Sequence, residues 1–146
     1  MPGIVVGVDG SGHSQRALEW AMKEAVIRHA PLTVLTVHDA VAGYFGGVAV
    51  YPDDPAQTEN ARKAAQAETD KVLAELAEPH PESVTVKAVH GFPVQELIDA
   101  GKDADMVVLG SRGAGGFARL LMGSVASQVA QHAYCPVLIV PPENRS

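Results

Sequence analysis

The segment that decides the fold is Asp105-Met-Val-Val-Leu109, which passes directly into Gly110-Ser-Arg-Gly-Ala-Gly-Gly116, the densest group of glycines in the chain. A short apolar run that stops at a turn is typical of a strand buried in a parallel sheet. Beyond the glycines, Ser124 is a good N-cap for a helix that carries Val125 and Val129. The segment therefore predicts a strand, a glycine turn and a helix in that order.

The beginning of the chain has the same organisation. Residues 4–8, Ile-Val-Val-Gly-Val, form an apolar run that ends in Asp9-Gly-Ser-Gly12. From Ser14 to Val26 the apolar residues recur at the three- and four-residue spacing of a helix with one buried face, and Pro31 closes that segment. A second strand, turn and helix are expected here.

The remaining segments repeat this alternation. We expect strands over residues 32–37, 83–89 and 137–140, and helices from Pro55 to about Leu76 and from Pro93 to about Lys102, the first of them capped by Asp54. Alternating apolar strands and helices predict a single α/β domain over residues 1–146, doubly wound and Rossmann-like. Its five-stranded parallel sheet has the order 3-2-1-4-5 and helices on both faces.

Residues 39–54 are expected to form one long loop, because they contain Gly43, Gly46 and Gly47. Loops of this length in compact domains are usually lids or flexible inserts, and the sequence leaves both alternatives open.

Composition excludes several classes of protein. The chain has 146 residues, 47% hydrophobic and 19% charged, as in ordinary globular domains. A formal net charge of −6 disfavours nucleic acid and anionic membranes as partners. No apolar window reaches the roughly 18 residues of a membrane span and no leader is recognisable, so a cytoplasmic location is expected.

Cysteine and histidine usage argues against disulfides and metal sites. The single cysteine, Cys135, precedes Pro136 and is expected to be a small buried side chain rather than a nucleophile. None of the six histidines stands three or four residues from another on one helix face, so no histidine metal site is expected. Trp20, beside the apolar stripe of the first helix, is expected to pack against the protein.

In the order 3-2-1-4-5 the first and fourth strands are neighbours, and the winding of the sheet reverses between them. The turns after both strands are rich in glycine, which lets backbone amides approach a ligand and form a concavity for anions. Residues 106–142 contain Arg112 and Arg119 and no acidic residue, so this segment is positive within an acidic chain. A phosphate group is therefore the expected ligand at this point.

For two residues, Asp9 and Ser124, the sequence allows two alternative roles in such a site. Asp9 either accepts hydrogen bonds from a ribose or a base, or shares a magnesium ion with the phosphates through bound water. Ser124 either caps its helix or donates a hydrogen bond to phosphate, and we favour the phosphate.

At these residues the chain resembles the universal stress protein family, specifically its ATP-binding branch. The pattern G-x2-G-x9-G-(S/T) of that branch is matched by Gly110, Gly113, Gly123 and Ser124 at the same spacing. The first strand and its turn, the stretch Gly91-Phe-Pro93 and the closing stretch Cys135-Pro-Val-Leu-Ile-Val140 are similar to the corresponding parts of the family. The match runs nearly from end to end.

The resemblance implies that Asp9 and its turn contact the nucleotide and that the backbone of Val37, at the end of the second strand, packs beside adenine. It also implies that residues around the fourth strand surround ribose and phosphates. Together with the turns identified above, the predicted contacts to ATP are Gly7, Val8, Asp9, Gly10, Ser11, Val37, Gly110, Ser111, Arg112, Gly113, Gly115, Gly116, Gly123, Ser124 and Val125. A homodimer through the last strand, Val137 to Val140, is implied as well.

The expected function is that of a nucleotide-dependent stress-response or signalling module that hydrolyses ATP slowly or not at all, because the P-loop pattern G-x4-G-K-(S/T) is absent from the sequence. At most it would be a weak ATPase. An alternative is an enzyme like the ATP pyrophosphatases, which cleave ATP at the α-phosphate, since Asp9-Gly-Ser-Gly-His-Ser14 loosely resembles their loop. A phosphoacceptor receiver domain is disfavoured, because His90-Gly91 and Pro141-Pro142 stand where it needs an aspartate and a lysine.

Overall fold

The computed structural model describes residues 3–9, 13–39, 41–44, 47–50, 54–111 and 123–141. In chain order the elements are β1 (Ile4–Val8), α1 (His13–Arg28), β2 (Leu32–Asp39), β3 (Val41–Tyr44), β4 (Gly47–Val50), α2 (Pro55–Glu75), β5 (Val84–Gly91), α3 (Pro93–Gly101), β6 (Met106–Gly110), α4 (Ser124–His132) and β7 (Val137–Val140).

The main sheet has five strands in the order β5-β2-β1-β6-β7, and every neighbouring pair is parallel. Numbered among themselves, these strands have the predicted order 3-2-1-4-5, so the predicted fold class is confirmed. The first and fourth strands of the prediction, β1 and β6, are neighbours, with Ile4 paired with Met106 and Val6 with Val108.

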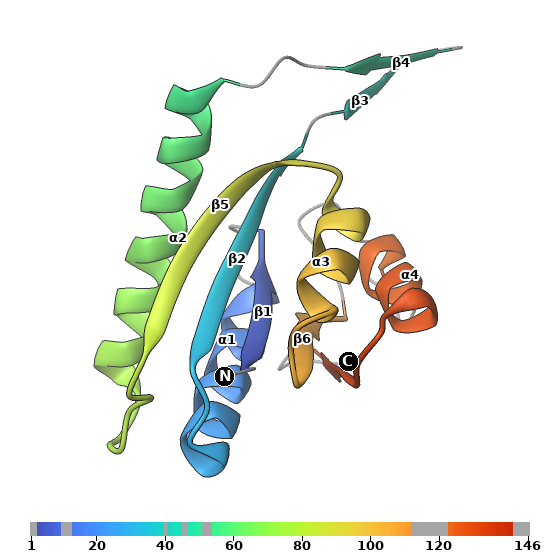
Figure 1. Ribbon diagram of the computed structural model, residues 1–146. Coiled ribbons are helices and arrows are strands. Elements are labelled where there is room, and N and C mark those ends of the chain that lie inside the picture. The colour runs from blue at the N-terminus through green and yellow to red at the C-terminus, as the bar shows by residue number, and fades with distance from the viewer. Residues whose placement is uncertain are drawn as a thin grey trace.

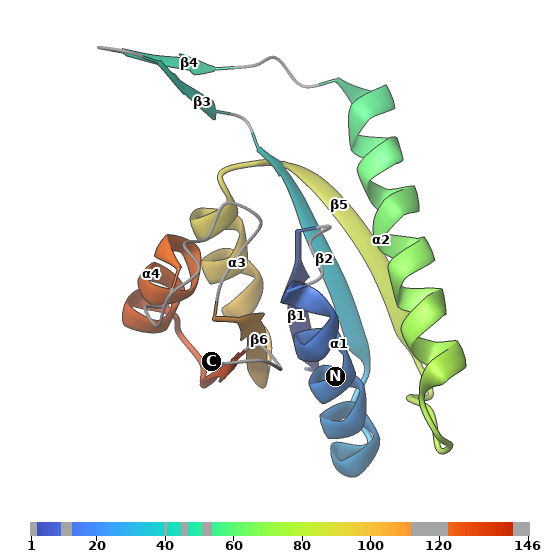
Figure 2. The same cartoon turned by 180° about the vertical axis from the view of Figure 1, so that it is seen from behind.

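The helices cover both faces of this sheet (Figures 1 and 2): α1 and α2 lie on one face, α3 and α4 on the other. Successive residues of β1 point to opposite faces, and both sets are buried. Ile4, Val6 and Val8 pack with Leu18 and Met22 of α1 in one core cluster. Val5 belongs to the second cluster, which includes residues of α3 and α4. Burial on both faces explains why the strand sequences are almost uniformly apolar.

The predicted limits of α2 are confirmed. Asp54 is its N-cap, with a side-chain oxygen that accepts a hydrogen bond of 3.0 Å from the amide of Ala56, and Pro55 is the first helical residue. Leu76 is the C-cap. The helix α3 begins at Pro93, as expected.

The prediction of one long loop over residues 39–54 is wrong. Val41–Tyr44 and Gly47–Val50 pair antiparallel as a second, two-stranded sheet, which extends away from the end of β2 (Figure 1). The glycines suggested a loop, but valine at positions 41, 48 and 50 and tyrosine at 44 have high β-propensity. Two short strands separated by two residues are the ordinary spacing of a hairpin.

The second strand also runs further than predicted. We expected it to end at Val37, whereas β2 continues to Asp39, because its pairing with β5 continues through His38 with His90 and Asp39 with Gly91. Local composition contains no signal for these last two pairs, since they depend on a strand about fifty residues away in the sequence.

Candidate functional site

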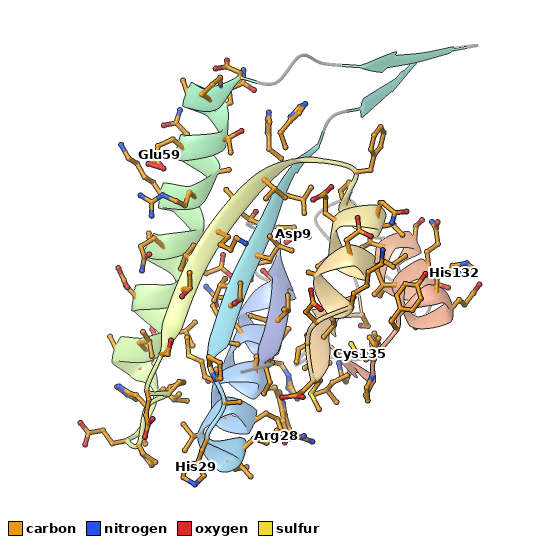
Figure 3. All side chains as sticks on the ribbon, in the orientation of Figure 1. Asp9, Arg28, His29, Glu59, His132 and Cys135 are labelled. Carbon is orange, nitrogen blue, oxygen red and sulfur yellow. The ribbon has the colours of Figure 1, made fainter. Side chains whose placement is uncertain are left out.

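The carboxyl ends of β1 and β6 lie side by side at one edge of the sheet. Because Ile4 pairs with Met106 and both strands have five residues, their last residues, Val8 and Gly110, lie at the same level. Asp9 follows β1 directly and is exposed, and Figure 3 shows it beyond the end of that strand. The sheet therefore brings Asp9 and the start of the glycine segment to one edge, where ligands bind in open α/β sheets.

Both ends of the glycine segment are attached at this edge. The amide of Gly123 donates a hydrogen bond of 2.6 Å to the carbonyl oxygen of Ser111, and the amide of Ser111 donates one of 3.0 Å to Val140 in β7. Three predicted contact residues, Gly110, Ser111 and Gly123, are thus neighbours at the end of β6. Ser111 and Gly123 are adjacent in space although they are twelve positions apart in sequence.

Ser124 is the first residue of α4, and the structure corrects its expected role as a cap. Gly123 is the N-cap, and no side chain caps the helix. The Ser124 hydroxyl oxygen instead accepts a hydrogen bond of 2.9 Å from Nε2 of Gln128. Since a hydroxyl has one hydrogen and two lone pairs, this leaves its hydrogen available for donation.

The first turn of α4 therefore has donors suited to an anion. Backbone amides at a helix N-terminus point outward without helical partners, and the helix dipole favours negative charge there. Ser124 is exposed beside them, and the neighbouring Val125 has 37% of its surface exposed. Main-chain amides and one hydroxyl at this place match the requirements of a phosphate group.

Val37 lies just beyond the end of β1. Val8 pairs with Thr36, so β2 extends past its β1 neighbour from Val37 onward. On its other side Val37 pairs with Val89 of β5. Its side chain packs against the core cluster under α3 and α4. The side of the Val37 backbone that faces away from β5 therefore has no β1 residue beside it, and it lies next to the edge where Asp9 is found. The strand β2 itself continues beyond Val37 to Asp39.

Neither Gly7 nor Val8 offers a side chain to the predicted site. The side chain of Val8 is buried in the core on the α1 side. A Cβ on Gly7 would lie 2.7 Å from Cδ2 of Leu109 and 3.0 Å from Cδ2 of Leu97. A side chain at position 7 would therefore have to displace the buried Leu109, so glycine here suits the close packing under α3.

One polar group near Asp9 was not predicted. The buried hydroxyl of Ser14, in the first turn of α1, donates a hydrogen bond of 3.1 Å to Oε1 of Glu68 in α2. Burial raises the pKa of Glu68, the hydrogen bond from Ser14 lowers it, and the negative charge of Asp9 raises it again. Asp9 and Ser14 thus both affect the ionisation of Glu68. The sequence does not indicate this contact, because Ser14 and Glu68 are 54 positions apart.

Six predicted contact residues lie outside the described residues: Gly10, Ser11, Arg112, Gly113, Gly115 and Gly116. The two turns that contain them begin at Asp9 and Ser111, which the structure does describe.

Two further residues with sequence-based expectations, Cys135 and Trp20, lie outside this edge. Cys135 was expected to be buried, but it is only half-buried. Partial burial still raises the pKa of its thiol above the ordinary value of 9.0, which fits the expectation of an unreactive cysteine. Figure 3 places Cys135 toward the opposite edge of the sheet from Asp9. Trp20 was expected to pack, but 43% of its surface is exposed, so that expectation holds only in part.

Within the described residues, no group of three or more histidine, cysteine, aspartate or glutamate side chains is arranged to hold a metal ion. None of the helices in the same part of the chain is long and apolar enough to span a bilayer.

Known proteins match this chain over nearly its whole length. A model of the universal stress protein family matches residues 2–141. A universal stress protein of Mycolicibacterium smegmatis is 37% identical over 140 residues, which cover 94% of this chain and 47% of that protein. One from Mycobacterium tuberculosis is 34% identical over 145 residues, with 94% and 47% covered. The chain thus spans about half the length of these relatives.

Solved structures of the same kind share the fold. Universal stress protein UspA from Lactobacillus plantarum superposes with a TM-score of 0.68 at 26% identity, covering 95% of this chain and 97% of that one. A universal stress protein in complex with cAMP has the same TM-score and identity, with 97% and 98% covered. Both structures thus share the fold of this chain over nearly its whole length.

Proposed function

Because this chain belongs to the universal stress protein family, we propose that it binds an adenine nucleotide, ATP, at the edge formed by the ends of β1 and β6. In this proposal the chain is a single cytoplasmic nucleotide-binding domain that acts as a stress-response or signalling module. It hydrolyses ATP slowly or not at all.

The observation that carries the proposal is the closure of the glycine segment by the hydrogen bond from Gly123 to Ser111. This bond brings Gly110 and Ser111 at one end of the motif next to Gly123 and Ser124 at the other. The two ends of the motif meet at Ser111 and Gly123, which are twelve residues apart in sequence and adjacent in space. The amides of Ser111 and Gly123 already donate to Val140 and Ser111. In this proposal a triphosphate is therefore held by the amides of the first turn of α4, which have no partner within the helix, and by the Ser124 hydroxyl.

Charge favours the phosphates at this place. Residues 106–142 carry two arginines and no acidic side chain, in a chain with a formal net charge of −6. The first turn of α4 adds the positive end of a helix dipole, worth roughly 0.3–1 kcal/mol when exposed, so hydrogen bonds from amides and from Ser124 must supply most of the affinity.

The nucleoside part is assigned to the β1–β2 side of the edge. The exposed carboxylate of Asp9 suits the hydroxyls of a ribose, and the backbone of Val37 lies beyond the end of β1, where a base can lie against it. Carboxylate oxygens are also acceptable ligands for Mg²⁺, and Asp9 would hold a phosphate-bound magnesium ion through water. The related structure with cAMP supports an adenine nucleotide as the ligand class.

A homodimer through β7 is part of the same proposal. The order of the main sheet places β7 (Val137–Val140) at its end, beside β6. An apolar edge strand is a liability in a monomer, and pairing with a second copy covers it.

The experiment that tests the proposed function is thermal unfolding of the pure chain with ATP, ADP, AMP, cAMP and GTP, each with and without MgCl₂. At a hundredfold excess over Kd, ATP should stabilise the folded chain by about 2.7 kcal/mol. GTP is the matched control for the base. Absence of stabilisation by every adenine nucleotide would refute the proposal, and release of pyrophosphate would favour the pyrophosphatase-like alternative instead.

A further inference from the structure

Two histidines that sequence spacing did not connect lie against each other in the fold. His38, in β2, and His90, in β5, are paired in register, and their ring centroids are 5.4 Å apart. We infer that these two side chains form a binding site for one divalent transition-metal ion, with Zn²⁺ as the ion to test. The site is distinct from the proposed nucleotide site and does not depend on it.

The geometry of β2 and β5 places the side chains of His38 and His90 next to each other. Side chains alternate along a strand, so His38 is on the same face of β2 as Leu32 and Val34, which belong to the core cluster under α1 and α2. His90 is likewise on the face of Val84 and Val86 in β5. Neighbouring strands are about 4.8 Å apart, and residues paired on one face therefore have adjacent side chains.

The separation and tilt of the rings suit chelation. A histidine nitrogen binds Zn²⁺ at about 2.0–2.1 Å, and two imidazoles bound to one ion at ordinary ligand angles have centroids about 5 Å apart. The observed separation is 5.4 Å and the rings are tilted by 42° rather than stacked face to face. Chelation requires a side-chain rotation that brings one nitrogen of each ring to a common ion.

The two rings are partly accessible to water. Both rings are half-buried, which limits their conformational freedom while water retains access. The helix α2 covers this face of β2 and β5, and its first turns lie near the ends of these strands (Figures 1 and 2).

The side chains on the first turns of α2 also fit a bound ion. Thr58 is on the stripe of α2 that includes the buried residues Ala65, Thr69 and Val72, and its hydroxyl oxygen is buried with no hydrogen-bond partner in the described part of the chain. A water bound to the metal would give this oxygen a partner. The positive charge of Arg62, one turn further along, is paired with Glu59.

Two imidazoles with water in the remaining positions form an open site. Imidazole suits Zn²⁺, Cu²⁺ and Ni²⁺ and is a poor ligand for Mg²⁺ and Ca²⁺, so the ion is distinct in class from the one that accompanies ATP. Among the described residues no third histidine, cysteine or acidic side chain joins the two rings, and the proposed site has water in its remaining positions.

The test is a titration of the full, nucleotide-free chain with ZnCl₂, followed by calorimetry and by NMR signals of the imidazole nitrogens. One Zn²⁺ per chain should bind, and the signals of His38 and His90 should shift together and saturate at the same equivalence point. The variants His38→Gln and His90→Gln should each lose at least about tenfold in affinity, while His132→Gln, which removes an exposed histidine on α4, should bind as the unaltered chain does.

Three results would overturn the inference: no binding by the unaltered chain at 1 mM ZnCl₂, unchanged affinity in both single variants, or a zinc-dependent shift at only one of the two rings. The NMR measurement needs no substitution, so it decides the question even where a variant unfolds. The zinc titration contains no ATP or GTP, because the phosphates of these nucleotides bind zinc themselves.

Discussion

The amide nitrogen of Gly123 lies 2.6 Å from the carbonyl oxygen of Ser111. This hydrogen bond joins the end of β6 to the residue that caps α4, so the glycine motif begins and ends at one place in the fold. That place is beside Asp9, because β1 and β6 are neighbours with matching ends. The three features together define the edge at which we place the nucleotide.

Ser124→Ala should weaken ATP binding without destabilising the fold. The hydroxyl accepts from Gln128 and has a hydrogen left to donate to phosphate, and a hydrogen bond to a charged group contributes about 1.5–3 kcal/mol, or at least about tenfold in Kd. Isothermal titration with ATP measures this loss. Ser124 is exposed, so the melting temperature without ligand should not change.

The matched control is Gln128→Ala, which removes the partner of the hydroxyl and leaves the hydroxyl in place. Its effect on ATP affinity should be clearly smaller than that of Ser124→Ala. Equal losses in the two variants would show that orientation of the side chain, rather than donation to phosphate, is what the serine contributes.

Gly7→Ala should destabilise the protein. The added Cβ would lie 2.7 Å from Leu109 and 3.0 Å from Leu97, between the sheet and α3, and overpacking of this kind costs typically about 1–3 kcal/mol. Urea unfolding measures the free energy. Gly101→Ala, where the nearest atoms are at 3.2 Å, is the comparison and should cost less. If Gly7→Ala left stability unchanged, the packing role given to Gly7 would be wrong.

Glu68→Gln should change how stability depends on pH. Burial raises the pKa of Glu68 above its ordinary 4.5 in the folded chain, so the folded state binds the proton more tightly than the unfolded state. The free energy of unfolding therefore falls as pH rises from the unfolded to the folded pKa. The glutamine variant lacks this fall, and its stability relative to the unaltered chain should increase with pH across that interval.

Urea unfolding at several values between about pH 4 and pH 7 checks this, with Glu75→Gln as the control, because Glu75 is exposed near the end of the same helix. Parallel pH profiles for the Glu68 variant and the unaltered chain would contradict the burial of this carboxyl beside Ser14.

Cys135 should react slowly with alkylating reagents. Burial raises the pKa of its thiol, the hydrogen bond with the backbone of Val107 lowers it, and the charge of Asp105 raises it. Because the thiolate is the nucleophile, a raised pKa leaves less of it at neutral pH. Iodoacetamide labelling followed by mass spectrometry should be slower for the folded chain than for the chain in urea. Equal rates would contradict the prediction.

The strand order and the helix limits could be predicted because they depend on local patterns. The apolar runs ending at Val8 and Leu109 are recognisable individually, and the rules of parallel α/β sheets then fix which strands are neighbours. The cap at Asp54 and the prolines at 55 and 93 mark helix starts directly in the sequence.

The features that could not be predicted depend on register between distant segments. The extension of β2 past Val37, the pair of His38 with His90 and the contact of Ser14 with Glu68 each join residues that are at least fifty positions apart. Residue types alone do not indicate these pairs. The hairpin of β3 and β4 differs from the predicted loop for another reason, because the β-propensity of its valines and tyrosine outweighs the turn preference of its glycines.

The most direct test of the nucleotide site is an NMR titration of the ¹⁵N-labelled chain with ATP, observing backbone amides. The account predicts that the signals of Asp9, Ser111, Gly123 and Ser124 shift together with one saturating curve, and that signals at the opposite edge, such as those of Ile27 and Ala104, stay in place. Shifts confined to other parts of the fold, or no shift at millimolar ATP, would contradict it.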